Sequence, residues 1–182
     1  MKPLKSLASS VLVAFRNRNQ RHLRKLNDDI LIEAAMNFTP AYFNMAIYSY
    51  VLSKIVSKPR FLGRDYDAAL HDIEHALQNI ADAIDSVSEP ELLTMFPVLE
   101  KAVASLEQRD PRFVVDLLAK GKLKMAATLY AQGMSLGVAS QMTGMDKQEI
   151  LDYAGETMMF DRLKDEKPIM ERMKIARKLI GD

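Results

Sequence analysis

Apolar residues along this chain recur three or four positions apart, as on one face of a helix, and no segment shows the strict alternation of a half-buried strand. The clearest case is the segment 65–87, where five apolar residues follow a 3-4-3-4 spacing that suits packing in a helical bundle. These residues are Leu70, Ile73, Leu77, Ile80 and Ile84. The pattern therefore predicts an all-α protein.

Breaking and capping residues divide the first part of the chain into four predicted helices. Their ranges are 7–38, 40–58, 65–87 and 91–108. The first carries an arginine cluster near its middle, where it can be interrupted. Pro40 suits the first turn of the second helix, Ser88 is placed to cap the fourth, and Pro97 limits the first part of that helix. Together these helices predict an N-terminal bundle over residues 1–108.

The second predicted helix carries much of the aromatic content of the chain. Its aromatic residues are Tyr42, Phe43, Tyr48 and Tyr50. Large aromatic side chains bury a great deal of apolar surface, so we expect this stripe to lie in the core of the bundle. The alternative is that part of the stripe lines a ligand pocket.

Beyond the bundle the predicted helices are shorter. One helix is predicted over 112–120 with Gly121 as its end, and the next over 122–132 with Gly133 as its end. We therefore predict that residues 109–182 form a second unit, a compact cluster of short helices that finishes with a C-terminal helix.

The stretch 130–155 has the arrangement of a helix-turn-helix. Ser135 is placed to cap a first short helix over 136–143, and Gly144 supplies the positive φ that a tight turn requires. Asp146 and the glutamate three residues later form a capping box for the second helix. The side chains expected to face inward are Leu136, Ala139, Met145, Ile150 and Tyr153. The alternative is two short helices that merely close a helical domain.

Charge is distributed unevenly along the chain, although the formal net charge is only +1. Residues 1–25 carry seven bases and no acid, and residues 161–182 carry seven bases and five acids, so residues 26–160 sum to −8. This asymmetry predicts a basic N-terminal arm on an acidic body. There is no cysteine, which excludes disulfides, thiolate metal sites and thiol nucleophiles.

A DNA-reading helix-turn-helix places the start of its second helix in the major groove. Here that start offers Lys147 and Gln148, between the carboxylates of Asp146 and Glu149. Because affinity for duplex depends largely on neutralised phosphates, this unit must borrow positive charge from elsewhere in the chain. The further contact residues predicted on this ground are Lys122, Lys124, Arg16, Arg18 and Arg21.

The run "LYAQGMSLGVASQMTGMDKQEIL" resembles the helix-turn-helix core of small prokaryotic antitoxins, and the resemblance covers residues 122–155. In that family a Leu-Tyr-x-x-Gly-x-(Ile/Met)-Ser-Leu-Gly run leads into Ala-x-x-x-x-Gly-Met and a polar, capped helix. The residues that carry the match are Leu129, Tyr130, Gly133, Ser135, Leu136, Gly137, Ala139, Gly144 and Met145. The resemblance implies binding to an operator and to a ribonuclease toxin. Family members are much shorter, so the bundle is a departure from them.

Two other motifs suggest chemistry. The sequence "HDIEH" (71–75) fits the H-x-x-E-H pattern of a metallopeptidase class, but the apolar spacing around it turns His71 and His75 outward and no third ligand is identifiable. We expect a surface helix there, with adventitious metal binding as the alternative. Arg16 and His22 fit a loose pattern of helical-bundle ribonucleases, in which such a pair stabilises phosphoryl charge and moves a proton.

No phosphate loop, dinucleotide fingerprint or nucleophile elbow occurs, and no cofactor or metal is implied. The longest uncharged stretch, 34–53, is too polar to span a bilayer. The leading hypothesis is a cytoplasmic, non-enzymatic regulator of transcription that binds double-stranded DNA as a homodimer and can also bind a protein partner. The alternatives are a protein-interaction module with an architectural helix-turn-helix, and a helical-bundle ribonuclease.

Overall fold

The computed structural model describes residues 3–37, 39–108 and 116–162, and over these ranges the chain is helical without a strand. The all-α prediction is confirmed. The elements in chain order are α1 (Leu4–Arg16), α2 (Gln20–Asn37), α3 (Pro40–Val56), the 3₁₀ turns η1 (Pro59–Leu62) and η2 (Arg64–Tyr66), α4 (Asp67–Ala83), α5 (Glu89–Leu93), α6 (Phe96–Gln108), α7 (Leu117–Ala131), α8 (Leu136–Thr143), α9 (Lys147–Glu156) and α10 (Met159–Arg162).

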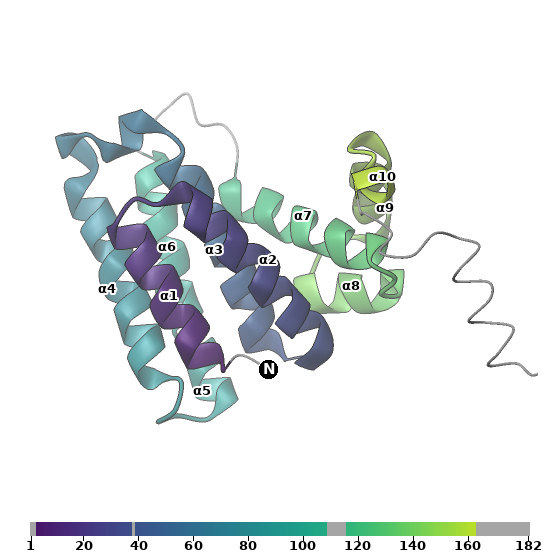
Figure 1. The fold of residues 1–182 in the computed structure, drawn as a ribbon, viewed down its shortest axis with the longest axis horizontal. Coiled ribbons are helices and arrows are strands. Elements are labelled where there is room, and N and C mark those ends of the chain that lie inside the picture. Colours follow the sequence, from purple (N-terminus) through teal and green to yellow (C-terminus); the bar gives the residue numbers. More distant parts are fainter. Residues whose placement is uncertain (1–2, 38, 109–115, 163–182) are drawn as a thin grey trace, which may run out of the picture.

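The longer helices of the N-terminal part pack around one core (Figure 1). α2 lies along α3, α4 lies along α6, and α1 contacts α2, α3 and α4. Phe15, Phe43, Tyr48 and Phe61 are among the largest fully buried side chains. The Tyr48 ring stacks on that of Phe96 with 5.7 Å between centroids, and its hydroxyl donates to the Phe96 carbonyl at 3.4 Å. Phe43 and Tyr48 of the aromatic stripe are therefore core, as predicted, whereas Tyr42 and Tyr50 are half-buried and Tyr50 lines a cavity.

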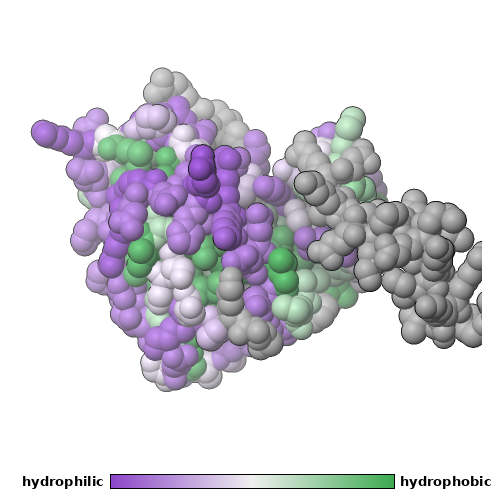
Figure 2. Space-filling model, in the orientation of Figure 1, coloured by the Kyte–Doolittle hydropathy of each residue, from purple (hydrophilic) through white to green (hydrophobic). Residues whose placement is uncertain are grey.

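The face of the bundle seen in Figure 2 is largely hydrophilic, with small separate apolar patches. Four apolar side chains on the described part of the bundle remain more than half exposed: Val13 on α1 (53%), Ile32 (53%) and Met36 (58%) on α2, and Val98 (58%) on α6. Single exposed apolar residues are normal on a protein surface. The two on α2 are one turn apart, and Ala35 between them lines a groove that is described below.

The predicted interruption of the first helix occurs within the arginine cluster, between α1 and α2. Arg18 has a left-handed backbone conformation with φ +51°, which reverses the chain. Asn19 then caps α2, because its Oδ1 accepts a hydrogen bond from the His22 backbone N–H at 3.0 Å. The break therefore has a local cause in the sequence "RNRNQ".

The basic N-terminal segment is not an arm that extends from the body, which corrects the prediction. Leu7, Val11 and Phe15 form an apolar stripe along α1 and are buried in the bundle core. Burying each such side chain stabilises the fold by roughly 1.5–3 kcal/mol, so this segment is an integral part of the bundle.

Two of the predicted helix boundaries in the bundle are confirmed. Ser88 forms a reciprocal capping box with Glu91 at the start of α5, and the hydrogen bonds from Ser88 hold the pKa of Glu91 below its ordinary value. The predicted helix 91–108 is interrupted after Leu93, and Pro97 occupies the second position of the new helix α6.

A single helix, α7, runs through Gly121, which corrects that boundary; residues 112–115 of the predicted helix 112–120 lie outside the described residues. Gly121 is buried in the middle of α7, where a Cβ would lie 3.0 Å from Cγ2 of Val51 on α3. The glycine therefore serves close helix–helix approach and does not end a helix. Gly133, with φ +101°, follows the end of α7 as predicted.

A second, smaller core lies between α7, α8, α9 and α10. Its buried members are Ala126, Ala127, Ala139, Ile150, Ala154 and Met159. α7 also contributes Leu117, Leu118, Met125 and Leu129 to the bundle core, so it packs against both groups of helices. The predicted C-terminal helix and its basic residues lie outside the described residues. No helix in the described part of the chain is long and apolar enough to cross a membrane.

Candidate nucleic-acid interface

The helix-turn-helix stretch forms two short helices joined by a tight turn. Ser135 caps α8 by accepting from the Val138 N–H at 3.2 Å, and Gly144 ends α8 with φ +72°. Asp146 caps α9 by accepting from the N–H groups of Gln148 at 2.7 Å and Glu149 at 3.4 Å. Each of these caps satisfies backbone donors that the first turn of a helix leaves unpaired.

The turn is also held from the first helix. The Ser140 hydroxyl on α8 donates to the Met145 carbonyl at 2.7 Å, which ties α8 to the segment that leads into α9. Ala139 and Ile150 are fully buried between the helices, and Tyr153 is half-buried against the same core. The inward face predicted for this unit is therefore present, with α7 as the third helix.

The exposed face of α9 is acidic. Residues 146–156 contain one base, Lys147, and four acids, and both Lys147 and Gln148 are exposed. The Gln148 amide donates to the Asp152 carboxylate at 2.8 Å, one helical turn away. Gln148 is thus already engaged by an acid, and phosphates that approach this face meet several carboxylates.

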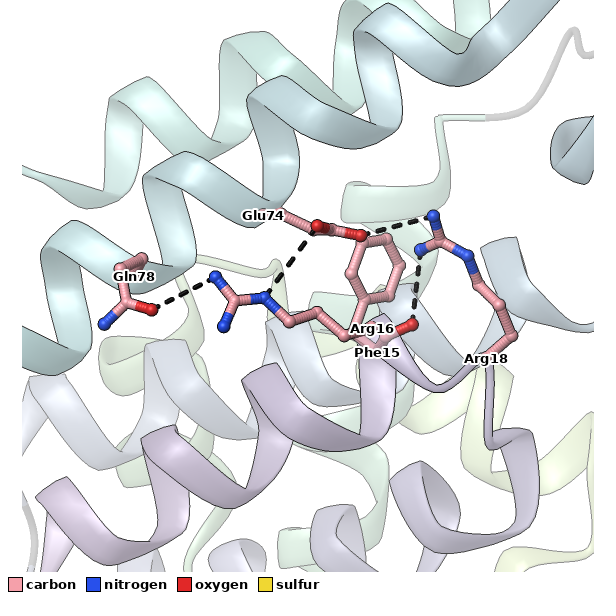
Figure 3. A network of polar contacts seen from close by, with 5 residues as sticks. All are labelled: Phe15, Arg16, Arg18, Glu74 and Gln78. Atoms are coloured by element: carbon pink, nitrogen blue, oxygen red, sulfur yellow. Dashed lines mark hydrogen bonds and ion pairs between the residues drawn. The ribbon is translucent and has the colours of Figure 1, made fainter. Parts of the chain in front are cut away.

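The two arginines at the end of α1 contact α4 (Figure 3). Arg18 lies 3.2 Å and Arg16 3.9 Å from the Glu74 carboxylate, and Arg16 also donates to the Gln78 side chain at 3.2 Å. A further bond from Arg18 reaches the Phe15 carbonyl at 3.2 Å. These arginines therefore join the α1–α2 turn to α4, and the structure does not bring them together with Lys147. The third predicted arginine, Arg21, is exposed on α2.

A groove between α2, α3 and α7 gathers charged and polar side chains around a cavity of about 360 Å³. We call this feature the basic groove. Its lining residues are Arg24, Asn27 and Asp28 from α2, Tyr50, Ser53 and Lys54 from α3, and Lys124 from α7. Of the contact residues predicted from the sequence, Lys124 is in this lining, and Lys122 lies half-buried two positions before it on α7.

Two ammonium groups of the basic groove lie over the Tyr50 ring. The Nζ atom of Lys124 is 4.3 Å and that of Lys54 is 5.2 Å from the ring centroid. Cation–π attraction holds the two ammonium groups near one aromatic ring. Two positive charges from different helices are therefore concentrated at one place.

The pKa shifts of Lys54 and Asp28 reflect the burial and the nearby charges of the groove. Burial lowers the pKa of Lys54 below its ordinary value, and repulsion from Arg24 and Lys58 lowers it further. Burial raises the pKa of Asp28, the Lys124 charge opposes this effect, and the neighbouring Asp29 carboxylate adds to it. The lining of the groove thus holds three cations and one carboxylate.

The basic groove lies next to the helix-turn-helix. Burial and then the nearby Tyr153 of α9 raise the pKa of the Tyr50 phenol, while Arg24 acts in the opposite direction. The Tyr50 side chain on α3, which lines the groove, therefore lies near the Tyr153 side chain on α9, the second helix of the motif. This adjacency follows from α7, which packs against α3 on one side and against α9 on the other.

At the two motifs that suggested catalysis, the histidines are exposed on helix surfaces. His71 and His75 are exposed on α4, as expected for a surface helix, and the intervening Glu74 is paired with Arg16 and Arg18. No group of three or more metal-ligating side chains occurs among residues 3–37, 39–108 and 116–162. His22 of the ribonuclease pattern is exposed on α2.

Arg24 and Lys54 are groove residues that the sequence interpretation missed. Arg24 belongs to the basic run at the N-terminus, and its charge was the available signal. Lys54 stands in a helix that reads as core, and only the packing of α3 beside α7 brings it next to Lys124.

In the comparisons with known proteins, no family model, curated protein or solved structure matched this chain. The antitoxin resemblance therefore rests on its motif residues alone.

Proposed function

We propose that this protein is a non-enzymatic, nucleic-acid-binding regulator that contacts the phosphates of double-stranded DNA through the basic groove. The observation that carries the proposal is the concentration of Arg24, Lys54 and Lys124 around a single carboxylate, next to the helix-turn-helix. Phosphate neutralisation supplies most of the affinity for duplex, and this groove provides the charge that α9 lacks.

In this proposal the helix-turn-helix has a secondary part in binding. On its second helix the Lys147 side chain is exposed, whereas the Gln148 amide is hydrogen-bonded to the Asp152 carboxylate. Base recognition by α9 is therefore expected to be weak, and backbone contacts dominate. A cytoplasmic homodimer remains part of the proposal, because helix-turn-helix regulators read two-fold sites as dimers.

Duplex binding at several salt concentrations tests the proposal. We expect fluorescence anisotropy of a labelled duplex to show binding that weakens steeply with salt. Replacing Lys54 and Lys124 together by glutamine should reduce the slope of log affinity against log salt by about two. The matched control is Lys101→Gln, which removes an exposed charge from α6, away from the groove. Absence of duplex binding at low salt would overturn the proposal.

A second variant measures the contribution of α9. Lys147→Glu reverses the one positive charge of that helix without touching its cap or its buried face. If α9 approaches the duplex, the variant binds more weakly than the wild type. Unchanged binding, with a loss in the double groove variant, would assign the contact to the groove alone.

A protein-interaction module is the second candidate, and one observation favours it. An apolar groove of about 390 Å³ lies between α2 and the α7–α8 corner, with Ala35, Met134 and Val138 in its lining. Exposed Ile32 and Met36 lie on α2 within one helical turn of Ala35. Met36→Glu should abolish self-association or partner binding measured by light scattering, whereas Val98→Glu, an equally exposed site on α6, should not.

A further inference from the structure

The basic groove is rigid at its base. The Asn27 amide, buried on α2, donates to the Ala46 carbonyl at 2.7 Å and to the Ser49 hydroxyl at 3.1 Å on α3. The Ser53 hydroxyl in turn donates to the Tyr50 carbonyl at 2.7 Å. The two Asn27 bonds hold α2 and α3 in one relative position, and the Ser53 bond lies within α3. The charged groups above them are therefore displayed on a preorganised surface, which lowers the entropic cost of binding.

The same bonds determine what kind of ligand the groove can take. The two amide hydrogens of Asn27 and the hydroxyl hydrogen of Ser53 are already donated to α3. The charged donors in the lining are the guanidinium of Arg24 and the ammonium groups of Lys54 and Lys124, and the Tyr50 hydroxyl is a neutral one. A ligand that meets such donors must present negatively charged acceptor oxygens, as phosphate does.

The net charge of the groove lining favours a phosphate monoester over a phosphate diester. The lining contains three cations, Arg24, Lys54 and Lys124, and one carboxylate, Asp28, which gives a net charge of +2. A phosphate monoester carries about −1.5 to −2 at neutral pH. A diester inside a strand carries a single charge of about −1, which leaves part of the groove charge uncompensated.

The cavity volume limits the size of the ligand, and the Tyr50 ring bears on whether the groove recognises a base. About 360 Å³ lies within the range of small-molecule sites and exceeds what a bare phosphate needs. Ammonium groups lie over the Tyr50 ring at 4.3 and 5.2 Å, so the ring is occupied by lysines and does not offer a stacking platform for a base. Recognition is therefore directed at the phosphate and not at the base.

We infer that the basic groove is a site for a phosphate monoester, held by Arg24, Lys54 and Lys124, as carried by the 5′ end of a nucleic-acid strand or by a free nucleotide. The inference deepens and rests on the proposed function, because it names the chemical group that the groove binds. Internal phosphates, which carry a single charge each, then bind the same groove more weakly than a terminal monoester does.

Isothermal titration of the full chain with two pairs of probes tests this inference. The first pair is deoxyadenosine 5′-monophosphate and deoxyadenosine, and the second is one duplex with 5′-phosphate or 5′-hydroxyl ends. We expect the monophosphate to bind and the nucleoside not to bind. The 5′-phosphorylated duplex should bind about tenfold more tightly than the 5′-hydroxyl duplex, as one well-paired charged group would give.

Two substitutions assign the effect to the groove. Lys54→Gln should remove the advantage of the 5′-phosphate, whereas Lys101→Gln should keep it. Asp28→Asn removes the one negative charge of the lining and should tighten monophosphate binding several-fold, by about half to one order of magnitude. Weaker binding in Asp28→Asn would overturn the inference, because it would make the carboxylate a ligand contact. Urea denaturation of each variant shows that it is folded.

The outcomes separate the inference from the function. Equal binding of both duplexes, with no binding of the monophosphate, overturns the phosphate-monoester site and leaves duplex binding standing. Binding of the monophosphate with no binding of either duplex supports the site and overturns the proposed function. Absence of binding in all four titrations overturns both.

Discussion

The Nζ atom of Lys124 on α7 lies 4.3 Å from the centroid of the Tyr50 ring on α3, and this contact joins the helix-turn-helix unit to the bundle. A cation–π contact at a partly desolvated site contributes about 0.5–2 kcal/mol. Tyr50→Leu should therefore lower the free energy of unfolding by about 1–2 kcal/mol in urea denaturation. Tyr50→Phe keeps the ring and should change it by less than about 0.5 kcal/mol. Equal losses in the two variants would contradict the cation–π explanation.

Gly121 should not tolerate a side chain. A Cβ there would lie 3.0 Å from Cγ2 of Val51 and 3.4 Å from Cγ2 of Ile47, both stiff and buried side chains. Gly121→Ala should lower the free energy of unfolding by about 1–3 kcal/mol, because overpacking outweighs the better helix propensity of alanine.

The matched control for Gly121 is Gly137→Ala in α8, where nothing lies within 4 Å of the added Cβ. This change should be neutral or stabilise by up to about 1 kcal/mol. If urea denaturation finds both substitutions stabilising, the close contact between α7 and α3 at Gly121 is contradicted.

The turn of the helix-turn-helix depends on the left-handed conformation of Gly144, with φ +72°. Gly144→Ala should cost about 1–2 kcal/mol, because a Cβ crowds the following carbonyl in this conformation. Gly144→Asn should cost less, since asparagine tolerates the left-handed region. Thermal unfolding of the three proteins should rank them glycine, asparagine, alanine; an equal midpoint for alanine would show that the turn has another conformation.

Lys54 should make stability rise with pH in the alkaline range. Burial, and then the nearby Arg24 and Lys58, lower the pKa of Lys54 in the folded protein below its ordinary value of 10.5. The unfolded chain therefore binds the proton more tightly, and stability increases as pH rises from the folded pKa toward 10.5.

Lys54→Gln should remove this pH dependence. At neutral pH the variant should be more stable than the wild type, and the difference should shrink as pH approaches 10.5, where the lysine is neutral in both states. Urea denaturation at a series of pH values measures this trend. A variant that is less stable at neutral pH would show that the Lys54 charge is compensated in the folded protein. A gain in stability with a loss of phosphate binding is typical of a functional site.

The pairing of Glu74 with Arg16 and Arg18 should stabilise the α1–α2 turn. The Glu74 side chain is only 22% exposed, and it accepts from Arg18 at 3.2 Å. Glu74→Gln should lower the free energy of unfolding by about 1 kcal/mol, with a smaller effect in high salt.

The control for Glu74 is Asp85→Asn, which breaks a pair with Lys5 at 2.8 Å. The Lys5 and Asp85 side chains are 47% and 63% exposed, so that water screens them well, and the loss should be smaller. Equal losses in the two variants would mean that the arginine contacts do not stabilise the turn.

Local features of the helix-turn-helix could be predicted closely. Ser135, Gly144 and Asp146 act on backbone groups within about four residues of themselves, and each has the role that its position predicted. Gly121 was misread for the opposite reason. Its neighbours in space are Val51 and Ile47, about seventy positions away in the chain, and nothing near Gly121 in the sequence distinguishes a helix end from a close contact.

The candidate site shows the same division. The charge of the first 25 residues was visible in the sequence, but Arg16 and Arg18 proved to be paired with α4, whereas Arg24 faces the basic groove. Which bases are paired and which are clustered depends on helix packing, because ion pairs form between residues that are distant in the chain.

The sequence by itself therefore determined the helical class, most helix boundaries and the form of the turn at 144–146, since periodicity, caps and glycine conformation act within a few residues. The tertiary structure decided that α7 packs against both α3 and α9, and so that Lys124 meets Lys54 over Tyr50. The physical reason is that burial of apolar faces selects the helix contacts, and the positions of the charged side chains follow from those contacts.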